Sequence, residues 1–207
     1  MKNSGQIENI SNPFENALLI ENYDNWYEEN RELYEKELTA IKELIPFKTP
    51  LEKETGLEIG VGTGRFASPL GIKFGLDSAF CPLKIAKKRN LNPIKAKAEL
   101  LPIKSNTFDI VLYVTTICFL ENPKKAILET KRILKKEGYV IIAFIDKDSP
   151  LGKKYEKKKQ KSPFYSKANF LSETEIKTLL TDTGFNIANT KKILDGFTII
   201  SAKNQPN

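Results

Sequence analysis

A glycine-rich turn is the feature of this sequence with the clearest chemical use. Residues 57–64 are LEIGVGTG, with glycines at Gly60, Gly62 and Gly64 and an acid at Glu58. A turn from a strand into a helix presents backbone N–H groups and the positive end of the helix dipole, and glycines let a ligand approach closely. The segment predicts a binding site for a nucleotide-like ligand, with a tight structural turn as the alternative.

The spacing of the glycines narrows the choice of ligand. A dinucleotide-binding turn requires Gly-x-Gly-x-x-Gly, but Arg65 occupies the third glycine position and Gly64 comes one residue early. The Gly-Lys-Ser/Thr of a Walker phosphate loop does not follow either. Glu58 at the strand end would repel a diphosphate, whereas it suits an ammonium group. The turn therefore favours a ligand with an ammonium end.

A second carboxylate follows the next expected strand. Residues 74–78 are FGLDS, so Asp77 and Ser78 come directly after an apolar run. A carboxylate at the end of the second strand can accept hydrogen bonds from both hydroxyls of a ribose. Asp77 could instead cap the following helix.

The order of these and later motifs resembles that of class I S-adenosylmethionine-dependent methyltransferases. The first motif of that family is similar to Glu58-x-Gly60-x-Gly62-x-Gly64. The runs AELLP at 98–102 and FDIV at 108–111 resemble the adenine-side loop and fourth strand, and AILE at 126–129 with RILKKEG at 132–138 resembles the helix and turn before the fifth strand. The resemblance spans residues 23–185 and is strongest to the type 11 methyltransferase domains, which are related to enzymes of ubiquinone and menaquinone biosynthesis, and among these to small uncharacterised prokaryotic proteins.

The resemblance implies S-adenosylmethionine as the cofactor and S-adenosylhomocysteine as the product. It assigns the methionine end to the glycine turn, the ribose to the end of the second strand, the adenine to the loop after the third and the sulfonium to the end of the fourth. The implied cofactor-binding residues are Tyr23, Glu58, Gly60, Gly62, Gly64, Asp77, Ser78, Ala98, Glu99, Val114 and Thr115. Tyr23 and Trp26 resemble an N-terminal segment that folds over the cofactor, although Trp26 could equally be a core anchor.

Two positions depart from the family pattern. Many relatives have an acidic residue before Ala98 that accepts the adenine amino hydrogen, but this chain has Lys97. Many also have a histidine near the end of the segment after the fourth strand, where this chain has Phe119. The adenine amino group therefore needs another partner, and a histidine-assisted mechanism is excluded.

The absence of histidine limits the chemistry to positioning and exclusion of water. The chain has no histidine at all, which removes the commonest general base. A sulfonium methyl group is already activated, so in-line displacement needs only alignment and a dry site. The catalytic residues stay unknown, with Thr115, Thr116, Tyr165 and Glu121 as weak candidates.

The two cysteines, Cys81 and Cys118, have no zinc-ligand spacing, and we expect no metal site. A thiolate at Cys118 could bind a soft element such as arsenic. Arsenite methyltransferases generally use several cysteines, however, so a small buried residue is the simpler interpretation of Cys118.

An alternation of strands and helices must position these residues. A helical region is expected at 13–45 and strands at 56–59, 72–76, 94–98, 108–114, 139–145, 187–194 and 197–202. Helices are expected from about 65, at 82–88, at 123–134 with Gly138 as the C-terminal stop, and at 172–184 behind the capping box SETE. The pattern predicts an α/β fold: a Rossmann-like, doubly wound, mostly parallel seven-stranded sheet with a C-terminal antiparallel hairpin.

The 207 residues suit a single methyltransferase domain. We expect an N-terminal helical cap at 1–50, a cofactor-binding core at 51–145, an acceptor-side loop at 146–171, and a C-terminal helix and hairpin at 172–207. Phe164, Tyr165 and Phe170 in that loop could stack on a flat acceptor. A mobile, solvated loop is the alternative.

Composition bears on location and partners. The N-terminus is polar and no run of 18 apolar residues occurs, which predicts a cytoplasmic protein without a membrane span. The net charge of +7 includes a lysine-rich segment at 153–161. A small-molecule methyl acceptor is the favoured partner. A methyltransferase acting on RNA or protein through that basic loop is the alternative, as is a non-catalytic cofactor-binding protein; nucleic acid is disfavoured but not excluded, and the oligomeric state is unknown.

Overall fold

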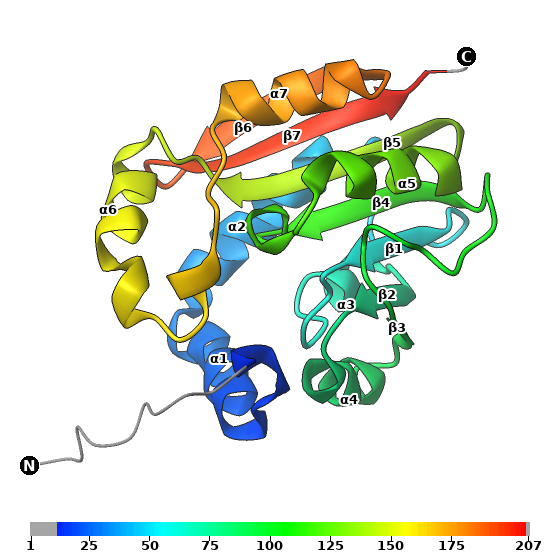
Figure 1. Ribbon diagram of the computed structural model, residues 1–207. Helices are drawn as coiled ribbons and strands as arrows, with labels where there is room; N and C mark the ends of the chain where they lie inside the picture. The colour runs from blue at the N-terminus through cyan, green and yellow to red at the C-terminus, as the bar shows by residue number, and fades with distance from the viewer. Residues whose placement is uncertain (1–11, 206–207) are drawn as a thin grey trace, which may run out of the picture.

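The computed structural model describes residues 12–205 and contains a seven-stranded sheet in the order β3-β2-β1-β4-β5-β7-β6 (Figure 1). The strands are β1 (Gly56–Ile59), β2 (Phe74–Asp77), β3 (Asn92–Lys95), β4 (Phe108–Val114), β5 (Leu134–Ile145), β6 (Phe185–Ile193) and β7 (Phe197–Asn204). Neighbours from β3 to β5 run parallel, and β7 runs antiparallel to both β5 and β6. The predicted fold class is confirmed.

Helices cover both faces of the sheet. On one face, α2 (Arg31–Leu44), α3 (Ala67–Leu70) and α4 (Phe80–Lys88) share a core with the side chains of β4, β5 and β7 that point towards them. On the other face, α5 (Pro123–Ile133) and α7 (Glu173–Asp182) pack on the alternate side chains of the same strands. Because β4 and β5 are buried on both faces, they are apolar almost without interruption, as expected of central parallel strands.

The chain reverses its direction of sheet building at β1. From β1 it proceeds outwards through β2 to β3 and then returns to place β4 on the other side of β1. The carboxyl ends of β1, β2 and β4 therefore meet at one edge, at a topological switch point. Ligands of open α/β sheets bind in the crevice at such a point.

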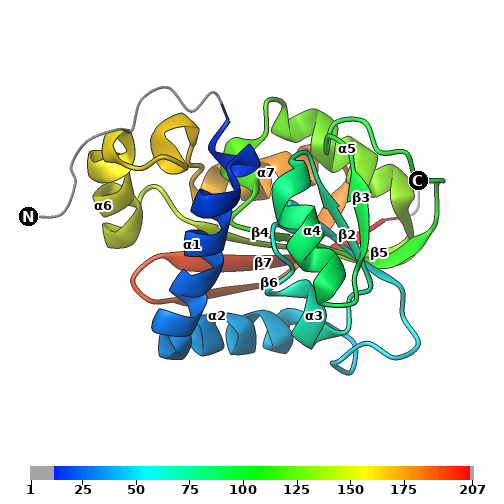
Figure 2. The same ribbon diagram turned by 90° about the horizontal axis from the view of Figure 1, so that it is seen from below.

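The N-terminal region crosses this edge as helices. A short 3₁₀ turn, η1 (Pro13–Glu15), leads into α1 (Ala17–Glu29), and Asn16 caps α1 by accepting a hydrogen bond from the backbone N–H of Leu19. In Figure 2, α1 runs between α4 and α6 (Pro150–Lys158) across the carboxyl end of the sheet. The predicted helical region at 13–45 is confirmed.

The prediction that residues 146–171 form a loop was wrong. It contains α6 and two 3₁₀ turns, η3 (Lys159–Lys161) and η4 (Tyr165–Lys167). Pro150 begins α6, and Ser149 caps it by accepting from the backbone N–H of Gly152. The lysine-rich composition hid this helix because its apolar residues are few.

Gly138 does not end a helix, which corrects a second expectation. Helix α5 ends at Ile133, with Leu134 already extended, and Gly138 lies inside β5. A Cβ at Gly138 would lie 3.0 Å from the carbonyl oxygen of Lys135 and 3.1 Å from that of Asp109. The glycine therefore permits close approach of backbone at the irregular start of the β4–β5 pairing.

The remaining C-terminal predictions are confirmed. Ser172 and Glu175 form the capping box of α7, and residues 194–196 join β6 to β7 as a hairpin. Within residues 12–205, the structure has no helix that is both long and apolar enough to cross a membrane.

Candidate active site

Two adjoining cavities lie at the carboxyl edge of the sheet. The main cavity has a volume of about 1060 Å³, including space open to solvent, and the side cavity about 280 Å³. Tyr23, Gly60, Gly62, Thr63, Val114 and Thr115 line both cavities. These shared residues define the junction between the two.

Gly62 and Asp77 connect the ends of β1 and β2. The Asp77 carboxylate accepts hydrogen bonds from the backbone N–H groups of Gly62, at 3.0 Å, and Ala79, at 2.9 Å. Burial nonetheless raises the pKa of this carboxyl above its ordinary value. Gly62 has a φ of +52°, and a Cβ there would meet no atom within 4 Å, so its backbone borders open space. A ligand can approach this backbone closely, as the glycine turn predicted.

Glu58 lies in the side cavity with one oxygen unpaired. The residue is 2% exposed, and its Oε2 has no hydrogen-bond partner among the described residues. Burial raises the pKa of this carboxyl well above its ordinary value, and the negative charge of Asp77 adds to the effect. A buried carboxyl is costly without a partner, so this pocket is suited to a cationic donor such as an ammonium group.

The other two glycines of the turn have different surroundings. Gly60, with a φ of +69°, lines both cavities, whereas Gly64 is among the lining residues of neither. A Cβ at Gly64 would come within 2.4 Å of Leu91 and 3.5 Å of Ala86, so this glycine lets the turn pack against α4 and the segment behind it. A direct role for Gly64 in ligand binding gains no support from this position.

The predicted adenine-side residues line the far end of the main cavity. Ala98 is buried, and Glu99 accepts a hydrogen bond from the backbone N–H of Asn122 at 3.2 Å. Lys97 also lines the cavity, where its ammonium pairs with Glu121 at 2.9 Å. Ser78 lies beside Asp77 in the same lining. The structure thus brings these expected residues together, with a lysine–glutamate pair where many relatives have an acid.

Tyr23 and Thr115 face one another at the junction. The Tyr23 hydroxyl lies 2.7 Å from that of Tyr27, and burial raises the pKa of Tyr23 to about 12 in spite of hydrogen bonds with Tyr27 and Thr115. Thr115 directly follows β4 and has a left-handed conformation, with a φ of +49°. Such a conformation is strained for a β-branched residue. In this conformation Thr115 lines both cavities at the junction.

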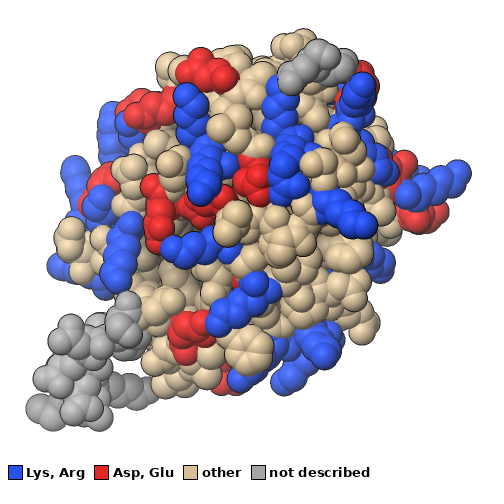
Figure 3. Space-filling model, turned by 45° about the vertical axis from the view of Figure 1, so that its right-hand side comes forward, with Lys and Arg blue, Asp and Glu red and all other residues tan. Residues whose placement is uncertain are grey.

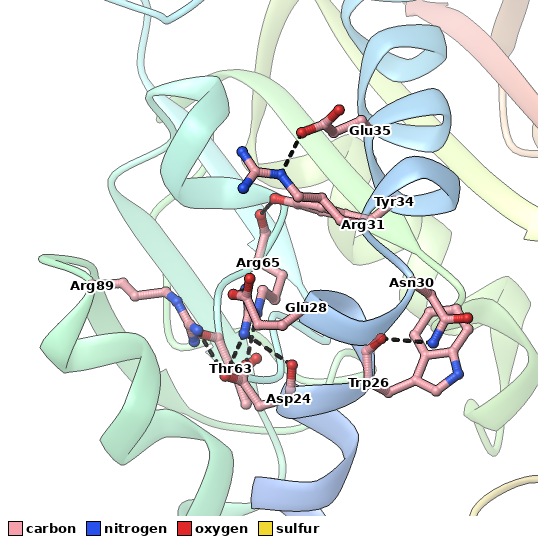
Figure 4. Close-up of polar contacts among 10 residues, drawn as sticks. All are labelled: Asp24, Trp26, Glu28, Asn30, Arg31, Tyr34, Glu35, Thr63, Arg65 and Arg89. Carbon is pink, nitrogen blue, oxygen red and sulfur yellow. Dashed lines mark hydrogen bonds and ion pairs between the residues drawn. The ribbon is translucent and has the colours of Figure 1, made fainter.

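An ion-pair cluster that sequence reasoning missed holds α1 over the glycine turn (Figure 4). Arg65 donates to both carboxylate oxygens of Asp24, at 2.7 and 3.0 Å, and Arg89 donates to Asp24 at 2.8 Å and to the carbonyl of Thr63 at 2.7 Å. Burial acts to raise the pKa of Asp24, but the hydrogen bonds from the two arginines prevail and hold it at about 2. Arg65, which occupies the position of the third glycine of a dinucleotide-binding turn, thus holds α1 in place through Asp24.

Trp26 has neither of the roles considered for it. It is 37% exposed, lines neither cavity, and points away from the Asp24 cluster in Figure 4. Helix α1 turns Tyr23 and Tyr27 inwards and Trp26 outwards. The expectation that Trp26 folds over the cofactor or anchors the core was wrong.

Aromatic side chains form the remaining wall of the main cavity. Phe164 and Tyr165 line it, as the sequence suggested, together with Phe14 and Phe119. Phe170, the third aromatic residue expected there, is 3% exposed and packs in a small core instead. No motif signalled Phe14, which comes from η1 and joins this wall only through tertiary packing.

Cys118 is unsuited to the thiolate chemistry considered for it. Its side chain is buried, does not line either cavity, and contacts the carbonyl oxygen of Thr115 at 3.5 Å. Burial raises the pKa of the thiol to about 12. The thiol therefore stays protonated, as expected of a small buried residue.

Comparisons with known proteins agree with this geometry. Residues 57–142 match the family model described as a methyltransferase domain. The uncharacterized protein MJ1123 of Methanocaldococcus jannaschii is 52% identical over 174 residues, which are 84% of this chain and 82% of that protein.

Solved structures extend the comparison to the fold. A protein of Thermotoga maritima, described as a SAM-dependent methyltransferase and possible histamine N-methyltransferase, is 38% identical, covers 91% of this chain and 98% of its own, and superposes with a TM-score of 0.82. A Haloferax volcanii protein, described as a putative methyltransferase in complex with the Trm112 methyltransferase activator, shares the fold with a TM-score of 0.74. The match covers 96% of this chain and 100% of that protein's chain, at 16% sequence identity. The match to the Thermotoga maritima protein covers nearly the whole chain at 38% identity, and it shows that this protein belongs to the S-adenosylmethionine-dependent methyltransferase family.

Proposed function

We propose that this protein transfers the methyl group of S-adenosylmethionine to a small-molecule acceptor. The observation that carries the proposal is the pair of carboxyl groups in adjoining cavities. Glu58 is buried with an unpaired oxygen on one side of the junction, and Asp77 borders the open backbone of Gly62 on the other. These are the groups that an ammonium and a ribose at opposite ends of one ligand would need.

The residues present fit this cofactor. Glu58 and the backbone of the glycine turn would hold the methionine end, Asp77 and Ser78 the ribose, and Ala98 with Glu99 the adenine. Tyr23, Val114 and Thr115 would surround the sulfonium at the junction. Lys97 is paired with Glu121, so we expect the adenine amino group to rely on backbone carbonyls or water.

When bound, S-adenosylmethionine supplies an activated methyl group, which leaves alignment and desolvation to the protein. Helix α1 and η1 cover the carboxyl edge, and the Asp24 cluster fastens them there. Covering the junction excludes water and restricts the approach of the acceptor to the direction in line with the breaking bond. No histidine takes part, because the chain has none.

Calorimetry with S-adenosylmethionine and S-adenosylhomocysteine tests the cofactor assignment. We expect both to bind the wild-type protein, Asp77→Ala to weaken binding by at least about tenfold, and Gly62→Arg to abolish it by filling the open space at Gly62. Phe80→Leu, on an exposed side chain outside both linings, is the matched control. Failure of the wild-type protein to bind either compound would contradict the proposal.

Turnover separates an enzyme from a non-catalytic cofactor-binding protein. The cofactor-loaded protein would be offered thiols, amines, phenols and nitrogen heterocycles, with histamine included because of the activity suggested for the Thermotoga maritima protein. Formation of S-adenosylhomocysteine and of a methylated acceptor, both by mass spectrometry, is the expected result. Tight cofactor binding without turnover on any acceptor class would favour the non-catalytic alternative.

A further inference from the structure

Four aromatic rings on the acceptor side of the main cavity contact one another in series. The ring centroids of Phe14 and Phe164 are 5.2 Å apart, those of Phe14 and Phe119 are 5.2 Å apart, and those of Phe119 and Tyr165 are 5.8 Å apart. Phe164 also lies 5.6 Å from Tyr23, which places this aromatic wall next to the junction. Each ring is only partly buried by protein, so each presents surface to the cavity.

The rings converge from three separate segments. Phe14 comes from η1, Phe119 from the turn after β4, and Phe164 and Tyr165 from the segment after α6. Phe119 and Tyr165 are stacked, whereas Phe14 is tilted or edge-on to its two neighbours, so a planar ligand can meet both ring faces and ring edges; aromatic faces also carry partial negative charge that attracts cations. The aromatic wall thus suits a planar molecule that is neutral or becomes positive.

The charges around the cavity oppose an anionic ligand. The charged residues in its lining are Asp77, Glu99, Glu121 and Lys97, and the single lysine is already paired with Glu121. The lining is therefore acidic although the chain carries a net charge of +7. Figure 3 shows basic groups scattered over the molecular face in view, mixed with acidic and uncharged ones. Within residues 12–205, the two basic residues that line the cavities, Lys97 and Arg65, are both paired with carboxylates.

Among the described residues, the lining of the main cavity also offers no unpaired base to remove a proton from an acceptor. Burial raises the pKa of Tyr165 well above its ordinary value and that of Tyr23 to about 12, so both hydroxyls stay protonated. Asp77 and Glu99 are engaged with backbone N–H groups. Glu37, whose pKa burial raises to about 7, lies on α2 outside the lining of either cavity.

We propose that the acceptor is a neutral, planar heteroaromatic molecule and that its ring nitrogen receives the methyl group. This proposal rests on the proposed function. The lone pair of the nitrogen forms the bond to the methyl carbon while the electron pair of the C–S bond returns to sulfur. One positive charge passes from sulfur to nitrogen and no proton is released, so the reaction needs no base.

Other acceptor classes fit this cavity less well. Aliphatic amines are protonated at neutral pH, which blocks the lone pair, and thiols or phenols must lose a proton that no free cavity residue can accept. Anionic acceptors would meet an acidic, aromatic site. A pyridine-type nitrogen is unprotonated at neutral pH, and its methylated product is a planar cation that the aromatic wall and the carboxylates favour.

Binding of isoquinoline and isoquinoline-5-sulfonate to the protein saturated with S-adenosylhomocysteine tests this directly. The two compounds share the ring and its nitrogen and differ in a negative charge. We expect isoquinoline to bind at least about tenfold more tightly, and the protein with S-adenosylmethionine to convert it to N-methylisoquinolinium, detected by mass. Equal or tighter binding of the sulfonate, or no detectable binding of isoquinoline, overturns the acceptor class.

The cofactor measurement keeps the two proposals distinguishable. If S-adenosylhomocysteine itself does not bind, the proposed function fails; if it binds and isoquinoline does not, only the acceptor class fails. Phe164→Leu should weaken isoquinoline binding by about three- to tenfold, which corresponds to loss of one aromatic contact. Its affinity for S-adenosylhomocysteine should stay within about twofold of wild type, and Phe80→Leu should change neither. An unaltered isoquinoline affinity in Phe164→Leu would contradict the aromatic wall.

Discussion

At the scale of single residues, the site depends on groups kept in unfavourable states. Glu58 is a buried acid with an unpaired oxygen, and Thr115 is a β-branched residue in a left-handed conformation. Buried acids and strained backbone are costly to the free protein and persist where the surrounding structure imposes them. Both residues border the junction of the two cavities. The free-energy cost of these two residues in the free protein is explained if a ligand bound at the junction relieves it.

The protonation of Glu58 should be linked to cofactor binding. Because burial raises its pKa well above the ordinary value, the carboxyl of the free protein keeps its proton at pH values where an ordinary glutamate is already ionised, and it must ionise to pair with an ammonium group. Binding then releases a proton, so affinity should fall as pH is lowered below the raised pKa. Calorimetry of S-adenosylhomocysteine in buffers of different ionisation enthalpy measures this release.

Glu58→Gln is the control, because it keeps the shape and removes the titration. The variant should bind more weakly and release fewer protons than wild type at the same pH, so that the difference isolates Glu58 from the titration of the ligand. Equal proton release by the two proteins would show that Glu58 does not change its charge on binding.

Replacing Thr115 by glycine should stabilise the protein while reducing its activity. The left-handed conformation costs a non-glycine residue roughly 1–3 kcal/mol, whereas glycine adopts it freely and loses about 0.5–1 kcal/mol through backbone entropy. We expect Thr115→Gly to raise the free energy of unfolding by about 1 kcal/mol in urea titrations and to lower the rate of methyl transfer.

Thr116 supplies the comparison for this experiment. Its φ is −98° and its hydroxyl donates to the carbonyl of Val114 at 3.0 Å. Thr116→Gly relieves no strain and removes this hydrogen bond, so it should destabilise by about 1 kcal/mol or more. If both glycine variants destabilise equally, the conformation of Thr115 carries no strain.

At the scale of elements, α1 is held mainly by the buried carboxylate of Asp24, with the exposed Glu28 as a second partner of Arg65. Asp24 receives hydrogen bonds from Arg65 and Arg89, which come from the turn after β1 and from the end of α4. The side chains of Asp24 and Arg65 are only 13% and 14% exposed. Because the pairing is largely shielded from water, it joins α1 to the cofactor-binding edge more firmly than a surface ion pair would.

Asp24→Asn should therefore loosen α1 over the site. The change removes the charge partner of Arg89 and leaves Arg65 with the exposed Glu28 alone, so it should cost up to about 3 kcal/mol of unfolding free energy and should speed the release of S-adenosylhomocysteine in stopped-flow experiments. Glu32→Gln removes an exposed pair with Lys36 on α2 and should leave the free energy of unfolding almost unchanged, because solvent screens this pair. Similar losses in the two variants, or unchanged release in Asp24→Asn, would show that the Asp24 cluster does not fasten the cap.

The same pairing predicts how stability depends on acid. The pKa of Asp24 is about 2 in the folded protein, below its ordinary value of 3.8. A lowered folded-state pKa means that this stabilisation is complete above about pH 4 and is lost as pH falls towards 2. Urea titrations of Asp24→Asn between pH 5 and pH 2.5 should show a shallower loss of stability than those of wild type.

At the scale of the whole molecule, the charge of the surface and the charge of the site differ. The lysine-rich segment at 153–161 forms the exposed side of α6 and η3, and none of its residues lines either cavity. The lining itself is acidic. An anionic acceptor such as RNA, attracted by the lysines, would meet the negative charge of the cavity lining and be repelled there. This difference favours a small-molecule acceptor over RNA.

Neutralising those lysines tests the RNA alternative. A variant with four lysines changed to Gln, at Lys153, Lys154, Lys157 and Lys158, should keep its turnover on a small acceptor within about twofold of wild type. These side chains are exposed and line neither cavity. A salt-dependent RNA affinity that the change removes, together with methylated RNA as a product of the wild-type protein, would instead support the alternative.

The sequence by itself determined the sheet and the cofactor edge. Alternating apolar strands and amphipathic helices predicted the doubly wound topology, and the order Glu58, glycine turn, Asp77 placed two carboxyl groups at neighbouring strand ends. Local patterns carry this information because strand ends of a parallel sheet meet at one edge whatever the rest of the chain does. Even there, Gly64 was expected in the site and lines neither cavity, since spacing does not distinguish a glycine that faces a ligand from one that faces a helix.

Only the tertiary structure decided what closes the site and what the acceptor meets. Phe14 and Phe119 are distant in sequence and come into contact only when η1 crosses the carboxyl edge. Asp24 and Arg89 are paired across 65 positions, and the lysine-rich segment forms a helix through a serine cap, a proline start and two apolar anchors, Leu151 and Tyr155, that pack on a small core. Such contacts leave no periodic signal, because they depend on the packing of whole elements. The glycine turn therefore predicts where a cofactor would bind, whereas the acceptor side of the proposed site is set by the way the N-terminal helices fold back over that turn.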